Sequence, residues 1–369
     1  MTAQTRYQTL RSTPSPEAIQ GYYDGMTQFW HPVLRSADLP AGEVRGVELL
    51  EEKIVLARLN GRLIAMEDLC RHFQAQLSQG EVRRLNGGDE CLSCRYHGWA
   101  YDAAGQCVEI PQLYAGREIP ASAKVPTFLT EERHGLIWVC LADRPAFPIP
   151  DFPELDDPAF HAGPLVSVGP WRGAAPRLIM GALDDTHHPW VHEGLLGDRS
   201  RVEPPDHKVW RDGPVLRVAF DWRQPLNEVI GGANGGQRIV AQDVDTAYEV
   251  GMPNVLRIIT VRYPVDAAGQ RGEGRRSFII WLTTCPIRYN KTVSFWRLVR
   301  DFDRDPAHDH IYEEFEDKIR AQDKPLLESQ RPWLLPPFWT KVQMPLRPAD
   351  LPLIEYQKWM EEMGLTAAV

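Results

Sequence analysis

Two short loops, each with one cysteine and one histidine, constrain the fold of this chain more than any other feature of its sequence. The first loop reads Cys70-Arg-His72, and the second reads Cys94-Arg-Tyr-His97. One site can use all four side chains only if the loops face each other. The 21 residues between His72 and Cys94 are rich in Gly, Asn and Asp, which suits a strand pair joined by turns. The sequence therefore predicts a β-rich unit that holds two ligand loops together.

Two cysteines and two histidines suit two kinds of metal site. One is a [2Fe-2S] cluster in which two histidines replace two thiolates on one iron and raise its reduction potential. The other is an ordinary tetrahedral zinc site. The two loops alone leave both alternatives open.

The remaining cysteines need a separate interpretation. Cys91 forms a second ligand-like pair with Cys94, but only Cys94 continues into a histidine and a Gly98-Trp99 turn, so we favour Cys94. Cys107, Cys140 and Cys285 are interpreted as small buried hydrophobic side chains. Six cysteines are also too few for a disulfide scaffold in a chain of 369 residues.

A second motif, Asp184-Asp-Thr-His187 followed by His192, suggests another metal site. We expect a helix over residues 178–188, which would place Asp184 and His187 on one face. Pro189 cannot continue that helix, so the chain can turn and bring His192 to the same point. Two histidines and one carboxylate form an iron site with coordination positions open for oxygen. We interpret His188 as a surface residue or as a support for the ligands.

The third ligand must then be a carboxylate from elsewhere, and the last long helix offers several. Asp323 lies near the apolar face of that helix, whereas Asp317 points to the opposite side. The apolar face comprises Ile311, Phe315, Ile319, Gln322 and Leu326. As an alternative, Asp323 could cap a helix that restarts at Pro325.

Length and patterning predict two domains of different character. Short β-type runs such as residues 53–59 and 135–141 extend from about Phe29 to Cys140. Dense prolines at residues 143–158 suit an extended linker, and we place the domain boundary there. Further strand-like runs begin at Val215, Val255, Ser277 and Thr292, and a helix is expected from about Pro306. This order predicts an α+β fold with an antiparallel sheet.

Charge and hydropathy exclude several classes of function. The chain has 41 basic and 50 acidic residues, a net charge of -9, and no basic stripe of the kind that binds nucleic acid. No apolar stretch has the length of a signal-peptide core or a membrane span. We therefore expect a cytoplasmic protein that binds neither nucleic acid nor membranes.

Taken together, these motifs resemble those of Rieske non-haem iron oxygenases. The resemblance covers nearly the whole chain, and it rests on the two ligand loops, the iron region, Phe29-Trp-His-Pro, Leu77-Ser-Gln-Gly-Glu-Val, Gly-Trp-x-Tyr-Asp after His97, and Gly135-Leu-Ile-Trp-Val. It implies an all-β Rieske [2Fe-2S] domain followed by a helix-grip catalytic domain with an antiparallel sheet and a long C-terminal helix. The expected bounds are 1–26 for an N-terminal arm, 27–146 for the Rieske domain and 147–369 for the catalytic domain.

The resemblance also implies roles for the site residues. Cys70 and Cys94 would bind one iron of the cluster, and His72 and His97 would bind the other. Mononuclear Fe(II) would be held by His187, His192 and Asp323. The stretch from Gln322 to Pro332 resembles the segment that bears the iron-binding aspartate, which favours Asp323 over Asp317, Asp309 and Glu313. Asp184 would hydrogen-bond the iron-ligating histidine and, across a subunit boundary, a cluster histidine of the neighbouring chain.

The activity implied is that of a terminal oxygenase component with O2 as co-substrate. Electrons would come from NAD(P)H through a separate reductase, with or without a ferredoxin, because this chain has no dinucleotide-binding GxGxxG motif. A homotrimer is expected. The closest resemblance is to monooxygenases that hydroxylate or oxidatively N- or O-demethylate a small heterocyclic or alkaloid-like molecule.

Two other functions stay open at this point. A cis-dihydroxylating ring dioxygenase uses the same iron site, and a Rieske electron-transfer protein would need no mononuclear iron at all. The substrate pocket should draw on residues 200–300. Its candidate lining residues are Trp222, Val229, Ile239 and Trp281.

Overall fold

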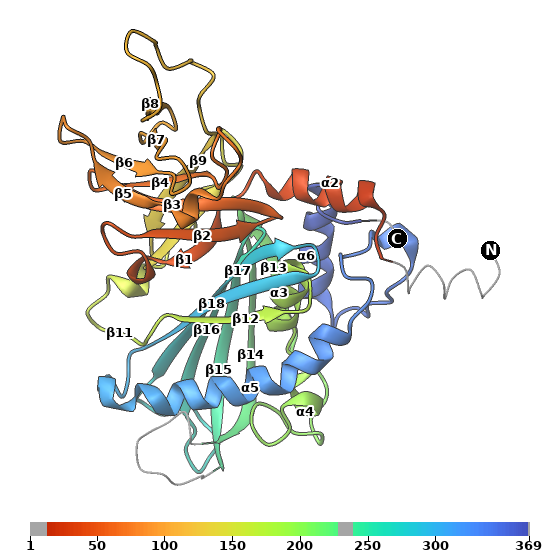
Figure 1. The fold of residues 1–369 in the computed structure, drawn as a ribbon. Coiled ribbons are helices and arrows are strands. Elements are labelled where there is room, and N and C mark those ends of the chain that lie inside the picture. Colours follow the sequence, from red (N-terminus) through yellow and green to blue (C-terminus); the bar gives the residue numbers. More distant parts are fainter. Residues whose placement is uncertain (1–12, 228–238, 368–369) are drawn as a thin grey trace. The chain divides into compact units, whose positions relative to one another are not determined.

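The computed structural model describes residues 13–227 and 239–367 (Figure 1). The chain divides into two compact units. We call Met26–Ile149 together with Cys285–Arg288 the β unit, and we call the described remainder of the chain the α+β unit.

The β unit contains two antiparallel sheets. The six-stranded sheet has the order β1-β10-β9-β4-β3-β2, and the four-stranded sheet has the order β5-β6-β7-β8. The bounds are β1 His31–Arg35, β2 Val44–Leu49, β3 Glu52–Leu59, β4 Arg62–Glu67, β5 Glu81–Arg84, β6 Glu90–Ser93, β7 Ala100–Tyr101, β8 Cys107–Glu109, β9 Thr127–Arg133 and β10 Leu136–Cys140. Single turns of 3-10 helix lie at Ser36–Asp38 and Leu77–Gln79.

Continuous apolar runs form the buried strands of this unit. Every residue of β10 is buried, and so are residues 54–57 of β3. The strands predicted at residues 53–59 and 135–141 are confirmed as β3 and β10. The ligand loops connect β4 to β5 and β6 to β7, so strand pairing positions both of them.

The α+β unit is built on an eight-stranded antiparallel sheet. Its order is β11-β18-β17-β16-β15-β14-β13, and β12 also pairs with β18. The bounds are β11 His161–Ala162, β12 Val166–Trp171, β13 Lys208–Asp212, β14 Val215–Asn227, β15 Ile239–Gly251, β16 Val255–Pro264, β17 Arg276–Arg288 and β18 Lys291–Arg300. The last four residues of β17 belong to the β unit.

Helices complete the structure around these strands. Their bounds are α2 Pro16–Met26, α3 Ala175–Leu183, α4 His188–Val191, α5 Asp309–Ser329 and α6 Leu351–Glu362, with 3-10 turns at Pro153–Leu155, Pro306–His308 and Phe338–Thr340. The helix predicted from about Pro306 is confirmed as a 3-10 turn followed by α5. Within the described ranges, no helix is long and apolar enough to span a membrane.

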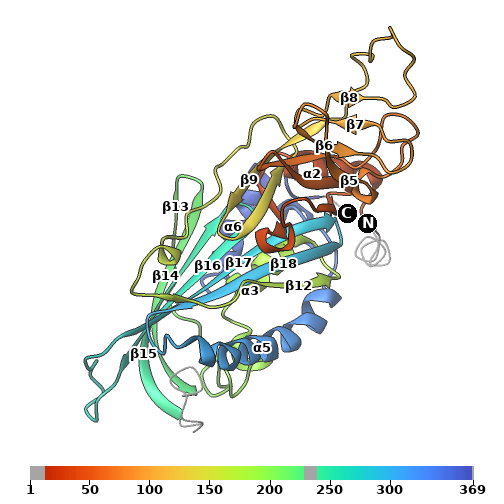
Figure 2. The same cartoon turned by 60° about the vertical axis from the view of Figure 1, so that its left-hand side comes forward.

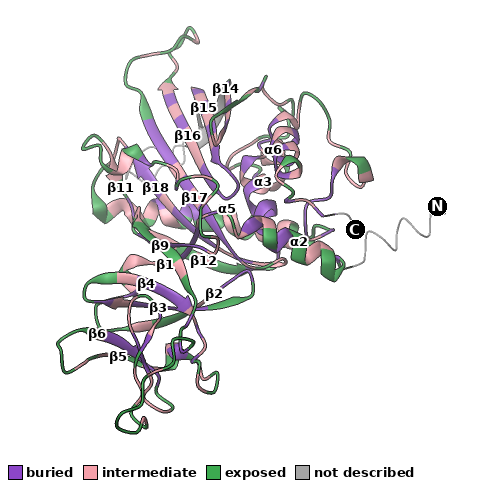
Figure 3. Ribbon diagram, turned by 90° about the horizontal axis from the view of Figure 1, so that it is seen from above, coloured by how far each residue is buried: buried purple, intermediate pink, exposed green. Residues whose placement is uncertain are grey.

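The longest helix, α5, lies across the long strands of the α+β unit (Figures 1 and 2). Its side chains Tyr312, Phe315 and Ile319 pack against Phe278 and Trp296 of the sheet. Burying each large apolar side chain contributes roughly 1.5–3 kcal/mol, which fixes the face that α5 turns to the sheet. Figure 3 shows the resulting buried strands in purple. The expected α+β class, with an all-β domain preceding the antiparallel sheet and a long C-terminal helix, is confirmed.

Candidate functional site

The two ligand loops of the β unit share one backbone turn. In each loop, the amide four residues after the cysteine donates to the cysteine carbonyl: Gln74 to Cys70 and Gly98 to Cys94, both at 2.9 Å. The donor residue has a positive φ in both cases, 49° at Gln74 and 76° at Gly98. Glycine adopts this conformation freely, whereas other residues do so at a cost. The two loops are therefore matching turns that each start at a cysteine.

The four predicted cluster residues lie in two pairs. Cys70 and Cys94 are buried, and burial, with a smaller contribution from the neighbouring Cys94 thiol, raises the pKa of Cys70. The imidazoles of His72 and His97 place their Nδ1 atoms 3.1 Å apart.

This pairing separates the two alternatives left open by the sequence. A zinc site would collect all four ligand atoms around one ion. Among the described residues, a grouping of three or more ligand atoms around one point occurs only in the α+β unit, and not in these loops. Two thiols on one side and two imidazoles on the other suit a two-iron cluster and not a single ion.

Aromatic side chains surround the imidazole pair and the thiols. The Tyr101 hydroxyl accepts from the Arg71 amide at 3.0 Å and lies 3.2 Å from Cys70 Sγ, so its own proton is available to the sulfur. The Trp99 ring stacks on His72 with centroids 4.7 Å apart. Sequence reasoning assigned no role to Tyr101, although its position seven residues after Cys94 was part of the recognised motif.

The other cysteines are buried and hydrogen-bonded to backbone. Cys91 donates to the Arg83 carbonyl at 3.4 Å, across the β5–β6 pair. The interpretation of Cys107, Cys140 and Cys285 as small buried side chains is confirmed.

In the α+β unit, the segment that carries the predicted iron ligands is not one helix. Helix α3 ends at Leu183, and Asp184 has an extended backbone. One Asp184 carboxylate oxygen accepts from both the amide and the hydroxyl of Thr186, at 2.8 and 2.7 Å. Asp and Thr side chains compete in this way for backbone groups and so terminate helices. The prediction of a helix over 178–188 is therefore wrong beyond Leu183.

A tight turn, and not a shared helix face, brings Asp184 and His187 together. His187 precedes the short helix α4, in which Pro189 occupies the first turn, so proline begins a helix here instead of ending one. The second carboxylate oxygen of Asp184 lies 3.4 Å from Nδ1 of His187.

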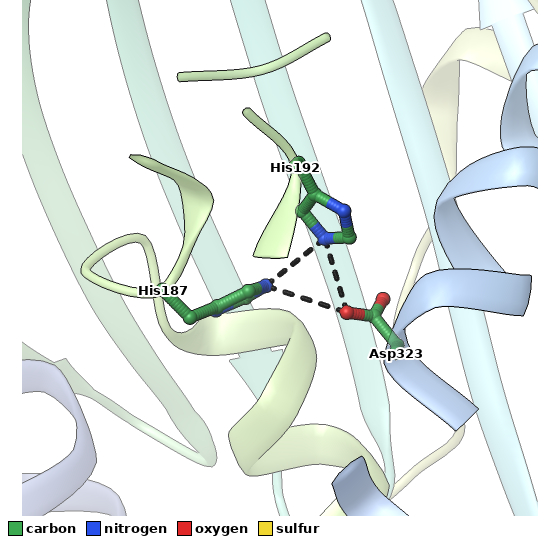
Figure 4. Close-up of side chains that lie close together, drawn as sticks. All are labelled: His187, His192 and Asp323. Carbon is green, nitrogen blue, oxygen red and sulfur yellow. Dashed lines mark hydrogen bonds and ion pairs between the residues drawn. The ribbon is translucent and has the colours of Figure 1, made fainter. Parts of the chain in front are cut away.

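The side chains of His187, His192 and Asp323 converge on one point (Figure 4). The two Nε2 atoms are 3.2 Å apart, and Asp323 Oδ1 lies 3.5 Å from His187 Nε2 and 3.0 Å from His192 Nε2. Ligand atoms bound about 2 Å from one ion at right angles are about 3 Å apart, so these spacings fit a single metal ion.

The other ring nitrogen of each histidine has a separate partner. Nδ1 of His187 faces Asp184, and Nδ1 of His192 donates to the Gln322 side-chain oxygen at 2.8 Å. Such contacts fix the tautomer and leave Nε2 for a metal. Sequence reasoning placed Gln322 on the apolar face of the helix and missed this role. Its position next to Asp323 was the available signal.

Charge in this group is balanced internally. Burial works against ionisation of Asp323, but hydrogen bonds with His187 and His192 lower its pKa to about 2. Burial likewise opposes a charge on His187, yet Asp184 and Asp323 raise its pKa to about 9. The carboxylates therefore stabilise positive charge at the point where the three side chains meet.

The competing carboxylates of α5 lie elsewhere. The Asp317 side chain is 70% exposed and pairs with Arg320 at 2.6 Å. Asp309 pairs with Arg300 and His161. Pro325 lies inside α5, which continues to Ser329, so the alternative in which Asp323 caps a restarting helix is wrong.

A cavity of about 180 Å³ opens next to the three converging side chains. It is bounded by α3, α4 and α5 on one side and by strands β15 to β18 on the other. Its described lining comprises Gly181, Ala182, His187, His188, His192, Leu196, Val244, Thr246, Tyr248, Ile258, Thr260, Arg262, Phe278, Ile280, Leu282, Trp296, Phe315, Glu316, Ile319, Arg320 and Asp323. His188 thus faces the cavity and not the surface.

The structure does not place any of the four residues that were expected to line the cavity in its described lining. The prediction that Trp281 lines the cavity is wrong. Its neighbours Ile280 and Leu282 face the cavity, and because successive residues of a strand point to opposite faces, Trp281 points away from it. Its ring instead stacks on Phe152, with centroids 5.4 Å apart. The side chains of Trp222 and Ile239, and all of Val229, lie outside the described residues.

Two family models match this chain. The Rieske [2Fe-2S] domain matches residues 29–128, and the vanillate O-demethylase oxygenase C-terminal domain matches residues 172–366. Methylxanthine N3-demethylase NdmB of Pseudomonas putida is 30% identical over 348 residues, which cover 93% of this chain and 90% of that protein. The chain belongs to the Rieske non-haem iron oxygenases.

Solved structures agree with this assignment. The Rieske oxygenase described here matches Pseudomonas putida CBB5 NdmA with caffeine at a TM-score of 0.76 and 28% identity, over 93% of this chain and 92% of that one. Dicamba monooxygenase bound to dicamba shares the fold, with a TM-score of 0.68 and 21% identity over 92% and 97% of the two chains. This Rieske oxygenase is an oxidoreductase of the monooxygenase type, and its family implies a Rieske cluster and a non-haem iron. Oxygenase components of this kind generally work with a separate reductase.

Proposed function

We propose that this Rieske oxygenase oxidatively demethylates a small N-methylated heterocycle. The observation that carries the proposal is the convergence of His187, His192 and Asp323 beside a largely apolar cavity. The relatives named methylxanthine N3-demethylase and methylxanthine N1-demethylase, each 30% identical to this chain, support the reaction and the class of substrate.

The two units would have different roles in the reaction. Residues 27–146, with Cys70, His72, Cys94 and His97, would hold the [2Fe-2S] cluster and carry electrons. Residues 147–369 would hold Fe(II) at the three converging side chains, and residues 1–26 would form an arm. The bound iron would supply the activation of O2.

The overall reaction balances as follows. The methyl group, one O2, two electrons and two protons give an N-hydroxymethyl group and one water. The hydroxymethyl compound then loses formaldehyde and leaves an N–H group. The electrons originate from NAD(P)H and reach the cluster through a separate reductase, with or without a ferredoxin.

The residues of the chain itself position the reactants. The heterocycle would pack against the sheet on Ile258, Ile280 and Leu282. The Asp184 carboxylate would keep the His187 ring oriented, and the Gln322 side-chain amide would do the same for His192. We further propose a homotrimer in which Asp184 bridges His187 and a cluster histidine of the neighbouring subunit. The 3.4 Å contact to His187 and the partial exposure of Asp184 support this role.

Single turnover tests the reaction without the native reductase. Protein loaded with both metals would be reduced chemically, freed of reductant and mixed with O2 and caffeine. Formaldehyde and the N-demethylated xanthine in equal amounts are the expected products. A product that retains every methyl group and gains two hydroxyl groups would favour cis-dihydroxylation, and consumption of electrons without any organic product would favour an electron-transfer protein.

Asp323→Ala is the critical variant, with Asp317→Ala as its matched control on the same helix. Asp317 is exposed and pairs with Arg320, away from the converging side chains. Formaldehyde release should vanish in Asp323→Ala and persist in Asp317→Ala, with the visible spectrum of the cluster unchanged in both.

A further inference from the structure

Arg262 on β16 is a buried cation in the wall of the cavity. Only 6% of the residue is exposed, and it belongs to the cavity lining. Among the described residues, none accepts a hydrogen bond from its Nε, and none forms an ion pair with its guanidinium. Its guanidinium carbon lies 4.5 Å from the centroid of the Phe278 ring, which offers only partial compensation for the charge.

The other charged residues of the cavity are already engaged. Arg320 pairs with Asp317 at 2.6 Å and with Glu316 at 3.8 Å, and it stacks on Trp296. Burial raises the pKa of Glu316 to about 7, so its carboxyl group carries only part of a charge near neutral pH. Burial lowers the pKa of Arg262 to about 9, which leaves it charged at neutral pH. Glu316 opposes this lowering electrostatically, but no hydrogen bond joins the two among the described contacts. Arg262 therefore contributes positive charge that the described residues do not neutralise.

The sheet register places Arg262 at the end of the cavity away from the proposed iron site. Arg262 pairs with Val244 of β15, whereas Ile258 pairs with Tyr248, four residues further along that strand. Four residues of strand span about 13 Å. Tyr248 marks the iron end, because its ring packs on Phe220 and Phe220 packs on His207. His207 in turn lies 3.0 Å from the carboxylate of Asp185, which is adjacent in sequence to Asp184.

Helix α5 gives the same order along the opposite wall. Arg262 interacts electrostatically with Glu316 and Tyr312. Glu316 lies seven residues before Asp323, which corresponds to about 10 Å along a helix. Both walls therefore separate Arg262 from the three converging side chains by roughly the length of a bicyclic molecule with one substituent.

The chemistry of arginine indicates what would occupy that end. A buried charge without a partner is strongly unfavourable, and an incoming counter-charge relieves that penalty. The planar guanidinium donates two parallel hydrogen bonds to a carboxylate or a similar oxyanion. Between Arg262 and the iron end, the sheet side of the lining is apolar or hydroxylic, with Thr246, Thr260 and Ile280. On the helix side, the charged Arg320 is already paired with Asp317 and Glu316.

We propose that Arg262 binds an oxyanion of the substrate, such as a carboxylate, at the end opposite the oxidised carbon. The substrate would be an N-methylated heterocyclic acid whose anionic group and methyl group lie about 10 Å apart. The identity of the oxidised end rests on the proposed function, whereas the anion site does not.

Matched ligands test this proposal by binding alone. Theophylline-7-acetate and theophylline-7-acetamide share one dimethylated ring system and differ in the charge of the side group. Calorimetric titration of the oxidised, metal-loaded enzyme should show the acetate binding roughly 10- to 100-fold more tightly than the acetamide. Arg262→Gln should abolish this preference, while Arg262→Lys should retain part of it.

Arg276→Gln is the matched control. Arg276 pairs with Arg262 in the sheet register, yet it is exposed and does not line the cavity. If the preference for the acetate came only from the overall positive charge, either variant would reduce it. The proposed site requires that only Arg262→Gln reduces it. If Arg262→Gln does not fold, the proposal is still tested by the affinities of the wild-type enzyme for the two ligands and by the reduced preference expected in Arg262→Lys.

Equal affinity for the two ligands in the wild-type enzyme, or no binding of the acetate, would overturn the proposal. An equal loss of preference in Arg276→Gln would also overturn it. If caffeine releases formaldehyde but the acetate is not preferred, the anion site is contradicted and the proposed demethylation stands. If the preference for the acetate depends on Arg262 but no N-methyl ligand releases formaldehyde, the proposed demethylation is contradicted and the anion site stands.

Discussion

Gln322 accepts a hydrogen bond from Nδ1 of His192 at 2.8 Å, so this imidazole is held from both sides by adjacent residues of one helix. The next residue, Asp323, lies 3.0 Å from Nε2 of the same ring. Because both contacts come from α5, packing of this helix on the sheet sets the orientation of His192 as well as the position of the carboxylate.

Loss of the Gln322 contact should weaken metal binding at this site. Without an acceptor at Nδ1, the His192 ring can rotate or adopt the other tautomer, and such losses typically reduce metal affinity 10- to 100-fold. Titration of the apo site with Fe(II) should show this reduction in Gln322→Leu, whereas Gln322→Glu should retain affinity because it keeps an acceptor. Unchanged affinity in Gln322→Leu would show that the contact has no role in metal binding.

The Tyr101 hydroxyl should raise the reduction potential of the cluster. It lies 3.2 Å from Cys70 Sγ, and a hydrogen bond to a ligand sulfur stabilises the reduced cluster, whose negative charge is greater. Tyr101→Phe should lower the midpoint potential by on the order of 50 mV, which corresponds to about one such hydrogen bond. Protein-film voltammetry measures this directly, and a potential that rises or stays constant would contradict the assignment.

Asp184→Asn should slow electron transfer without loss of either metal. Asparagine keeps the size of the side chain but removes the charge beside His187 Nδ1. In single turnover, oxidation of the reduced cluster should be at least roughly 10-fold slower than in the wild type, given the electrostatic contribution of one close charge. Equal rates with both metals in place would remove Asp184 from the electron path.

His31 should make the stability of the protein depend on pH in the acid range. Burial lowers the pKa of His31 to about 4, although its Nε2 hydrogen-bonds the Met26 carbonyl at 2.8 Å. In the unfolded chain the pKa is about 6.5, so between pH 6.5 and 4 only the unfolded state binds this proton. The free energy of unfolding should therefore fall as the pH falls through this window, by about 2 kcal/mol at pH 5.

Urea unfolding at pH 7 and pH 5 measures this contribution. The loss of stability between the two pH values should be smaller in His31→Gln than in the wild type, since glutamine does not titrate. The same loss in both proteins would mean that His31 takes up its proton equally well in the folded state.

The motifs named side chains that the structure brings close together, but they predicted less of the local structure around those side chains. The loops at Cys70 and Cys94 are set by short motifs, and the structure places the four side chains in two pairs. The helix expected through Asp184 failed because Thr186 bonds the Asp184 side chain, and such local competition has no periodic signal.

The lining of the cavity was harder to predict for a different reason. Residues 278–282 of β17 form a continuous apolar run, so hydrophobicity alone does not say which alternate set faces the cavity. Packing against α5 selects Phe278, Ile280 and Leu282 and turns Trp281 away. The same tertiary context buries Arg262, although charged side chains are mostly exposed in folded proteins.

The content of iron and acid-labile sulfide per chain tests the central claim most directly. Anaerobically purified protein should contain about three irons and two sulfides, one cluster plus one mononuclear iron. Asp323→Ala should contain about two irons and two sulfides, and Asp317→Ala should match the wild type. A wild-type ratio of about two irons to two sulfides, unchanged by added Fe(II), would contradict the mononuclear site and with it the proposed oxygenase mechanism.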